Sequence, residues 1–406
     1  MKRLGVIYEG WGECFDLGVL ADDGQQLLFE YTQAALDRGL ELSRFKLALK
    51  AGAFGHFPAH QYRLPGLVSD SLPDGWGMLL MDRLFRKRGI APHTISPLDR
   101  LAVIGRRGMG ALTYAPESEA PLVSAEANLR TIADEVQQAM SGDSEALLRE
   151  LVLMGGSPHG ARPKVLVNFD QGGNHMWNTE DAPGTPWLVK FPAQSESPET
   201  CAVEKLYSDL VRECGIDMPQ TGHFDLGSHG AAFAIERFDR CAGMRVPVHT
   251  AAGVAHADFR SPTLDYVNLL RIARFVTGDM REVETLFGRC VFNVVFNNRD
   301  DHSKNFSFRL ERGGQWRVAP AYDTTFNHGP AGQHQLDICG EAMAPARAHL
   351  MKLADMTGIH AAPATRIIDQ IADVAGHLAA RAAQYPISAA TVSELVRVVE
   401  GNRARM

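Results

Sequence analysis

The chain has 406 residues, of which 45% are hydrophobic and 22% are charged, and its formal net charge is −7. This composition is typical of a globular protein with sizeable cores and excludes a largely disordered chain. The apolar runs are too short to span a bilayer, and the acidic balance argues against a protein that coats nucleic acid by bulk charge. Because the first residues lack the cleavage pattern of a secretory signal, we expect a cytoplasmic protein that makes no membrane contact.

Residues 1–116 are predicted to form a first unit of mixed helix and strand. Two strand-like runs, 17–21 and 26–31, flank the turn sequence Asp22-Asp23-Gly24, which tolerates the positive φ of a tight hairpin. The segment Leu72-Pro73-Asp74-Gly75-Trp76-Gly77 then precedes an amphipathic helix pattern.

A second unit is predicted over residues 117–240, after a short linker rich in proline and acid. Helical spacing over 125–140 and 144–154 leads into a glycine-rich loop at 155–164, and a strand pattern follows at 165–169. Such a loop is a candidate for phosphate binding, because its main-chain N–H groups can approach phosphate oxygens.

Arg162 or Lys164 would add positive charge to this loop. The Walker A order is absent, which disfavours a P-loop nucleotide-hydrolysing enzyme, and an ordinary surface turn is the alternative.

A single lysine, Lys190, lies in the apolar strand pattern of residues 187–192. An unpaired ammonium there would be costly, so Lys190 is expected to meet an anion unless its side chain snorkels to solvent. Glu204 lies in the helix pattern that follows, and the two residues match the lysine–glutamate ion pair that positions ATP phosphates in kinases. The strand pattern at 231–240 is either an adenine-binding hinge or an ordinary edge strand.

Residues 241–406 are predicted to be mainly helical, with helices at 264–276, 280–296 and 364–385. The second helix leads directly into the polar run of residues 297–305. A buried helix would therefore deliver a solvent-facing or ligand-facing loop.

Within this run, Asp300 and Asn305 have the spacing at which kinase catalytic loops place the base and a metal-binding asparagine. A predicted hairpin follows, and then Asp323, where such folds place the aspartate that carries magnesium. Each residue alone could belong to a polar turn, but their order favours a phosphotransferase site.

These segments together resemble the HipA family of toxin-type serine/threonine protein kinases over essentially the whole chain. The matching segments are the Leu72–Gly77 stretch, the Ile-Gly-Arg-Arg-Gly-Met-Gly-Ala-Leu stretch at 104–112, the loop from Ser157 to Lys164, Val189-Lys190-Phe191, the stretch at 236–240, the stretch at 300–305, and Tyr322-Asp323. The resemblance implies an α+β, divergent two-lobed protein-kinase-like fold with an additional N-terminal subdomain. It also implies an enzyme that uses ATP and Mg²⁺.

The resemblance further implies roles for single residues. Asp300 would be the catalytic base, and Asn305 and Asp323 would hold Mg²⁺. Because Asp301 follows directly, exchanged roles of the two acids stay open, although the spacing to Asn305 favours Asp300. Ser157 would be phosphorylated by the enzyme itself, which would expel its loop from the phosphate-binding position; the alternative is a small residue needed for a tight turn. The residues implied to contact ATP are His159, Gly160, Ala161, Arg162, Pro163, Lys164, Lys190, Glu236, Arg237, Phe238, His302, Ser303, Lys304, Asn305, Tyr322 and Asp323.

The expected function is transfer of the ATP γ-phosphate to Ser or Thr of a protein. The resemblance extends to the family's kinase that silences glutamyl-tRNA synthetase. It also implies a helix-turn-helix, HipB-like antitoxin as a partner, and the chain would contact DNA only through this antitoxin. A small-molecule phosphotransferase is one alternative, which the family-like N-terminal unit disfavours. A catalytically silent co-repressor subunit is the other, which the retention of Lys190, Asp300, Asn305 and Asp323 disfavours.

Overall fold

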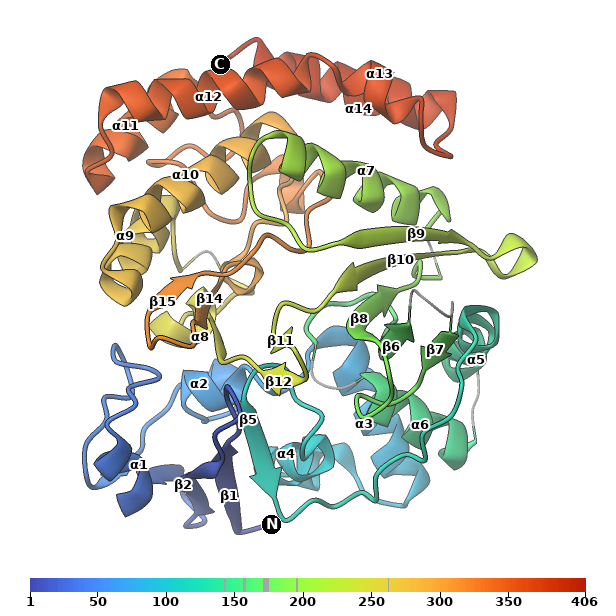
Figure 1. Ribbon diagram of the computed structural model, residues 1–406, viewed down its shortest axis with the longest axis vertical. Helices are drawn as coiled ribbons and strands as arrows, with labels where there is room; N and C mark the ends of the chain where they lie inside the picture. The colour runs from blue at the N-terminus through green and yellow to red at the C-terminus, as the bar shows by residue number, and fades with distance from the viewer. Residues whose placement is uncertain (142–143, 156–157, 171–174, 195, 262) are drawn as a thin grey trace. The chain divides into compact units, whose positions relative to one another are not determined.

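The computed structural model describes residues 1–406 except 142–143, 156–157, 171–174, 195 and 262 (Figure 1). The chain forms two compact units. Unit 1 comprises Met1–Pro198 and Gly222–His249, and unit 2 comprises Glu199–Thr221 and Thr250–Met406. The predicted three-part division, with boundaries after residues 116 and 240, remains a prediction.

The first sheet of unit 1 has five strands in the order β4-β3-β2-β1-β5. Their bounds are β1 Arg3–Tyr8, β2 Phe15–Asp22, β3 Leu27–Tyr31, β4 Ala53–Phe54 and β5 Leu112–Ala115. The predicted hairpin is confirmed, since β2 and β3 pair antiparallel and Gly24 between them has a φ of 90°. The Asp22 and Asp23 carboxylates accept hydrogen bonds from the main-chain N–H groups of Gly24 and Gln25, each at 2.8 Å.

Four α-helices lie between β3 and β5 in the chain of unit 1. They are α1 Gln33–Arg38, α2 Gly66–Ser69, α3 Gly75–Lys87 and α4 Pro97–Ile104. Helix α3 buries its apolar side, including Leu80 and Leu84, as its amphipathic pattern predicts. Helix α4 begins at a capping box in which Ser96 and Asp99 satisfy each other's main-chain N–H groups.

The second sheet of unit 1 has the order β7-β6-β8-β10-β9. Its strands are β6 Lys164–Asp170, β7 His175–Trp177, β8 Thr185–Lys190, β9 Thr221–Asp225 and β10 Ala231–Glu236, and helices α5 Leu129–Ser141 and α6 Glu145–Gly155 precede it in the chain. The short strands β11 Arg240–Cys241 and β12 Met244–Arg245 follow it. Strand β13, Val248–Thr250, lies where the chain passes from unit 1 into unit 2.

The predicted helix at 125–140 was wrong at its start, because residues 125–127 pair with residues 176–178 instead. Ala127 N–H donates to the main-chain oxygen of Met176 at 2.7 Å, and Asn178 N–H donates to that of Ala125 at 3.2 Å. These strand-type hydrogen bonds hold the chain extended until Leu129.

Unit 2 is mainly helical and also contains the β14–β15 hairpin. Its elements are α7 Glu199–Glu213, α8 Ala251–Ala255, α9 Tyr266–Thr277, α10 Met280–Val295, β14 Ser307–Leu310, β15 Trp316–Val318, α11 Arg347–Thr357, α12 Ala361–Ala375, α13 Leu378–Ala382 and α14 Ala389–Arg403. Helix α10 is buried from Leu286 to its end, and α9 and α12 pack against it (Figure 1). The core of unit 2 is therefore built around α10, and the predicted α+β class is confirmed.

The predicted helix at 364–385 is instead two helices, α12 and α13, which are separated at Gly376. A β-carbon on Gly376 would lie 3.1 Å from the Arg403 guanidinium, so a larger residue would crowd this approach of α14. Glycine is also a poor helix former, which favours a break at this position.

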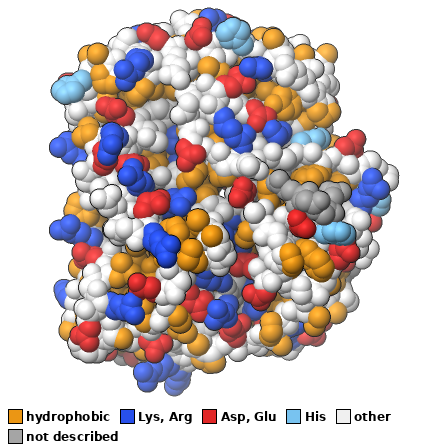
Figure 2. All heavy atoms as spheres, in the orientation of Figure 1, with side chains coloured by type: hydrophobic (Ala, Val, Ile, Leu, Met, Phe, Trp, Pro, Cys, Tyr) orange, Lys and Arg blue, Asp and Glu red, His pale blue; other side chains and the backbone are white. Residues whose placement is uncertain are grey.

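Basic and acidic side chains are interspersed over the face of the molecule in Figure 2. In the described part of the chain, no helix is long and apolar enough to cross a bilayer.

Candidate active site

The polar run of residues 297–305 follows directly on helix α10, as predicted. Asn297 has a φ of 57°, which turns the chain sharply where the helix ends. Its main-chain oxygen accepts a hydrogen bond from Asn327 N–H at 3.0 Å, and its side chain donates to the Asn327 main-chain oxygen at 3.1 Å. The buried helix and these bonds together hold the start of the loop.

Asp300 and Asn305 form one hydrogen-bonded turn. The Nδ2 group of Asn305 donates to the main-chain oxygen of Asp300 at 2.7 Å. The Asp300 side chain is 44% exposed, and His302 Nε2 lies 3.9 Å from its Oδ1 atom. A carboxylate in this position is accessible to a substrate hydroxyl, which a general base requires.

Asp301 has a different environment, because its side chain is fully buried. Its Oδ2 atom accepts a hydrogen bond from the Tyr266 hydroxyl at 2.8 Å and lies 2.8 Å from Nδ1 of His334. Its Oδ1 atom accepts from the main-chain N–H of Gln335 at 2.8 Å. Asp301 thus anchors the segment around residue 334, and the geometry supports Asp300 rather than Asp301 as the base.

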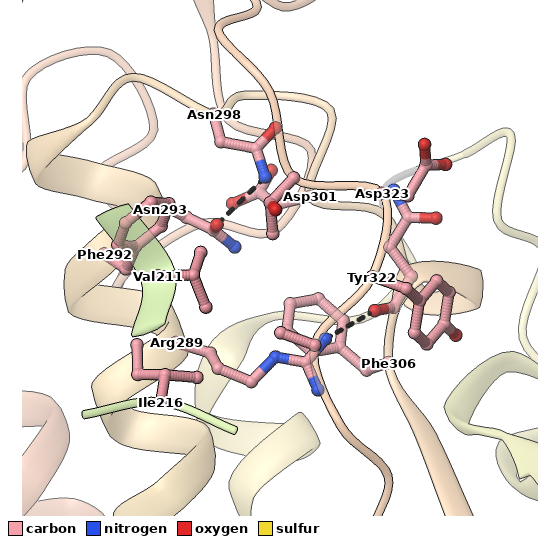
Figure 3. Close-up of a pocket in the computed structure, with 13 residues that line it drawn as sticks. Val211, Ile216, Arg289, Phe292, Asn293, Asn298, Asp301, Phe306, Tyr322 and Asp323 are labelled. Carbon is pink, nitrogen blue, oxygen red and sulfur yellow. Dashed lines mark hydrogen bonds between the residues drawn. The ribbon is translucent and has the colours of Figure 1, made fainter. Parts of the chain in front are cut away.

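The hairpin β14–β15 leads to Asp323, as predicted, with residues 319–322 between them. Asp323 has a φ of 54°, a left-handed conformation that costs a non-glycine residue about 1 kcal/mol and is common at functional sites. Asp323 lines the same small pocket as Asn298, Asp301 and Asn305. Figure 3 shows its carboxylate pointing away from Arg289.

The predicted ATP-contacting residues 302–304 lie beside Phe259 and Tyr322. The ring of His302 lies 5.4 Å from that of Phe259, and Lys304 Nζ lies 4.3 Å above the same Phe259 ring. Ser303 is buried. The Tyr322 hydroxyl donates to the main-chain oxygen of Lys304 at 2.6 Å. This bond joins the loop to the residue that precedes Asp323.

Arg289 of α10 is a site residue that the sequence analysis missed. Its guanidinium donates to the main-chain oxygens of Asn305 at 2.9 Å and Ala319 at 3.3 Å, and it lies over the rings of Phe306 and Tyr322 (Figure 3). Burial lowers the pKa of this guanidinium from its ordinary value. A lone arginine within a buried apolar helix pattern was the available signal, of the same kind that singled out Lys190.

Asn305 and Asp323 fit the oxygen ligands that Mg²⁺ prefers. The Nδ2 group of Asn305 is committed to Asp300, so its Oδ1 atom is the one suited to a metal. In the described part of the chain, no group of three or more His, Cys, Asp and Glu side chains is arranged to hold a metal ion. Proteins commonly bind Mg²⁺ through one or two of their own oxygens, together with substrate phosphates and water.

In unit 1, the glycine-rich loop docks onto the start of helix α3. The Gly160 N–H donates to the Asp74 carboxylate, and the Gly160 main-chain oxygen accepts from Trp76 N–H at 3.2 Å. His159 Nε2 lies 3.1 Å from the main-chain oxygen of Leu72. Residues 72–77 stood out in the sequence, but no contact with this loop was predicted for them. Ser157 lies outside the described residues.

Two buried lysines lie side by side in the second sheet of unit 1. Lys164 on β6 and Lys190 on β8 are partners in the antiparallel register. Lys164 Nζ donates to the main-chain oxygen of His159, and Lys190 Nζ lies 5.9 Å from the centroid of the Phe233 ring. Arg162 pairs with Glu196 at 2.9 Å. Glu204 is a buried residue of α7 in unit 2, so its predicted ion pair with Lys190 joins residues of different units and stays a prediction.

Arg237, which was predicted to belong to the adenine-binding hinge, forms hydrogen bonds and ion pairs within unit 1. Its main-chain N–H donates to the Pro186 oxygen at 2.9 Å, and its buried guanidinium pairs with Glu180 and with Asp239, the latter at 2.9 Å. Asp239 also accepts a hydrogen bond from Gly110 N–H at 2.7 Å. This cluster ties the glycine-rich turn near residue 110 to β10. Contacts of Glu236 and Phe238 with adenine remain predictions.

Burial alone would raise the pKa of the two acids in this cluster, but the neighbouring guanidinium groups outweigh it. Arg237, Arg240 and Arg245 lower the pKa of Glu180 to about 2. Arg237 and Arg240 hold the pKa of Asp239 well below its usual range. Both carboxylates are therefore charged at neutral pH.

Two family models match the chain. The model described as HipA N-terminal domain matches residues 11–115, and the model described as HipA-like C-terminal domain matches residues 156–378. The second alone spans more than half of the chain. The chain belongs to the HipA family. The order of its site segments, from the loop before Lys164 to Asp323, lies within the HipA-like C-terminal match.

The HipA fold extends over nearly the whole chain. Shewanella oneidensis HipA, solved in a toxin–antitoxin complex with HipB and operator DNA, has a TM-score of 0.70 and 17% sequence identity, covering 98% of this chain and 96% of that one. The similarity shows a common fold.

Two further comparisons are weaker. The Helicobacter pylori proinflammatory kinase CtkA has a TM-score of 0.38 and 12% identity over 55% of this chain and 89% of that one, too distant to support an argument. A Haemophilus influenzae protein named "Putative kinase" is 25% identical over 147 residues, which is 32% of this chain. The chain spans 43% of the length of that relative.

Proposed function

We propose that this protein is the kinase of a toxin–antitoxin pair, which transfers the γ-phosphoryl group of ATP to a Ser or Thr hydroxyl of a protein. The observation that carries the proposal is the turn in unit 2: an accessible Asp300 carboxylate, with its main chain held by Asn305, and Asp323 on the same pocket as Asn305. Membership of the HipA family supports it.

In the proposed reaction, Asp300 accepts the proton of the substrate hydroxyl while the hydroxyl oxygen bonds to the γ-phosphorus. The bond from that phosphorus to the bridging oxygen breaks, and ADP leaves. Asn305 and Asp323 would hold Mg²⁺, which neutralises charge on the phosphate oxygens when bound. The Tyr322–Lys304 hydrogen bond and the two Arg289 hydrogen bonds keep Asn305 and the segment leading to Asp323 in place.

Lys190 and the loop at 158–164 are proposed to contact the ATP phosphates. Lys164 and Lys190 are both buried and lie beside each other on adjacent strands, so they place two positive charges close together, as a phosphate-binding site requires. Gly160 has a φ of 107°, a backbone conformation that residues with a side chain rarely adopt, and it lies against the flexible end of the Lys164 side chain. The loop therefore needs glycine at this position, which keeps the main chain close to the lysine.

The Shewanella relative was solved with HipB and operator DNA. We extend this partnership to the present chain: a helix-turn-helix antitoxin would bind it and would provide its only route to DNA. The protein substrate is proposed to be an aminoacyl-tRNA synthetase, such as glutamyl-tRNA synthetase, and Ser157 is proposed as a site of self-phosphorylation.

The test is phosphate transfer from labelled ATP with Mg²⁺, to the protein itself and to bacterial cell extract, with the labelled residues mapped by mass spectrometry. We expect labelling of Ser157 in the wild type, no labelling in Asp300→Asn, and transfer to extract but no self-labelling at residue 157 in Ser157→Ala. Asp355→Asn on the exposed side of α11 is the matched control and should behave as wild type. A wild type that binds ATP but transfers nothing would favour the co-repressor alternative.

A further inference from the structure

A glutamine far along the chain holds the side chain of the proposed base. Gln335 Nε2 donates a hydrogen bond to Asp300 Oδ1 at 2.6 Å, across 35 residues of sequence. The bond is short for an N–H···O contact, as expected when the acceptor is a charged carboxylate. Gln335 lies between Asp323 and helix α11, in a segment without regular secondary structure.

The main chain at Gln335 is itself fixed by the neighbouring acid. Gln335 N–H donates to Asp301 Oδ1 at 2.8 Å, and His334 Nδ1 lies 2.8 Å from Asp301 Oδ2. Asp301 is fully buried, and Tyr266, whose hydroxyl accepts from Asn293 at 3.0 Å, donates to it. Two consecutive residues, 334 and 335, thus bind two consecutive acids, 300 and 301. The Gln335 amide is presented from a rigid base, because its anchor lies in the core of unit 2.

Asp300 is therefore held at both ends by side-chain amides. Asn305 Nδ2 holds its main-chain oxygen at 2.7 Å, and Gln335 Nε2 holds its carboxylate at 2.6 Å. The terminal torsion of an aspartate side chain is soft, so an accessible carboxylate without such a bond would rotate among many orientations. A directional hydrogen bond to Oδ1 restricts this rotation.

We propose that Gln335 is a positioning residue that fixes the Asp300 carboxylate in the orientation in which it accepts the proton of the substrate hydroxyl. The inference rests on the proposed kinase function and adds a residue to it. Misorientation of a reacting group by as little as about 1 Å can cost roughly a hundredfold in rate. Loss of the Gln335 contact should therefore lower the catalytic rate and leave ATP binding unchanged, since no nucleotide-contacting residue is altered.

The kinetic test compares Gln335→Met with Gln333→Met, using labelled phosphate transfer to casein and to cell extract at varied ATP concentrations. Methionine keeps the length and volume of glutamine but removes the donor. We expect Gln335→Met to lower kcat about tenfold or more, with the KM for ATP within about twofold of wild type. Gln333 is exposed and two residues away, so the same substitution there is a matched control that should leave both constants unchanged. A purely structural role would instead lower the melting temperature and the active fraction, while transfer per folded molecule stayed normal.

A second measurement does not depend on activity. In protein labelled with ¹⁵N-glutamine, one side-chain amide proton of Gln335 should resonate downfield in the wild type and return toward the ordinary position in Asp300→Ala, while the Gln333 signal stays in place. An unchanged kcat in Gln335→Met overturns the proposal. A Gln335 amide signal that keeps its wild-type position in Asp300→Ala also overturns it. A wild type that transfers no phosphate overturns the proposed function instead, and the amide signal then decides separately whether Gln335 holds the carboxylate.

Discussion

The guanidinium of Arg289 donates a hydrogen bond to the main-chain oxygen of Asn305 across 2.9 Å, inside the core of unit 2. Substitution Arg289→Met removes this bond and the one to Ala319, and leaves two main-chain oxygens without their partner. Each hydrogen bond from a charged group contributes about 1.5–3 kcal/mol to stability. Methionine avoids the desolvation penalty of a buried guanidinium, and this offsets part of the loss. We expect a net loss of about 2–3 kcal/mol, which lowers the melting temperature by roughly 4–12 °C.

Calorimetry of the whole chain measures this loss. Arg317→Met is the control. The Arg317 side chain is 46% exposed, so its ion pair with Glu282 is only partly shielded from solvent. An exposed pair contributes at most about 1 kcal/mol, so Arg317→Met should melt close to wild type. Equal melting temperatures for the two variants would show that the Arg289 contacts contribute little.

Asp300→Asn and Asp301→Asn should separate catalysis from stability. Asp301 accepts three hydrogen bonds in the core, and an amide in its place would turn an N–H group toward one of the donors. We expect Asp301→Asn to lose about 2–4 kcal/mol of stability. Asp300→Asn should lose phosphate transfer but at most about 1 kcal/mol of stability, because its side chain is 44% exposed and an amide oxygen can still accept the hydrogen bond from Gln335. If folded Asp300→Asn kept full phosphate transfer and folded Asp301→Asn had none, Asp301 would be the base instead of Asp300.

The Arg237–Glu180–Asp239 cluster makes the stability of unit 1 depend on acid pH. The folded-state pKa of Glu180 is about 2, below its ordinary value of 4.5, and that of Asp239 is also depressed. As the pH falls, the two carboxylates are therefore protonated at a higher pH in the unfolded chain than in the folded chain. The stabilisation is fully present above about pH 5 and is lost progressively toward about pH 2.

Thermal melts of wild type and Glu180→Gln from about pH 3 to about pH 7 test this dependence. Glu180→Gln should melt lower at neutral pH, and its melting temperature should fall less steeply on acidification. Glu30→Gln, at an exposed position of β3, should follow the wild-type curve. Parallel curves for all three proteins would exclude Glu180 as a source of the acid dependence.

Gly75→Ala should disturb the proposed phosphate-binding loop from outside it. A β-carbon on Gly75 would lie 2.6 Å from the main-chain oxygen of Gly160, and backbone at this distance must move. Gly89, just past the other end of α3, also has a positive φ, but a β-carbon there would have no other atom within 4 Å. Both alanines cost about 1 kcal/mol of backbone strain, but only Gly75→Ala should also weaken ATP binding, by about tenfold in titration calorimetry. Equal ATP affinities of the two variants would argue against a role of the loop in binding.

Sequence reasoning succeeded where a signal lies within a few neighbouring residues. The hairpin at Asp22-Asp23-Gly24 and helix α10 follow from local turn chemistry and from apolar periodicity, respectively. It failed at the start of helix α5, where residues 125–127 pair with residues 176–178, roughly 50 residues later, and this pairing overrode the helical periodicity. A local pattern carries no information about a partner at that separation.

By itself, the sequence determined the chemical groups of the candidate site and their order along the chain, because these depend only on residue type and spacing. The tertiary structure alone decided that Asp300 is accessible while Asp301 is buried, that Arg289 holds Asn305, and that Gln335 holds the Asp300 carboxylate. The physical reason is that burial and side-chain hydrogen bonding are set by which distant segments pack together. That packing follows from the whole core of unit 2, and no short stretch of residues encodes it.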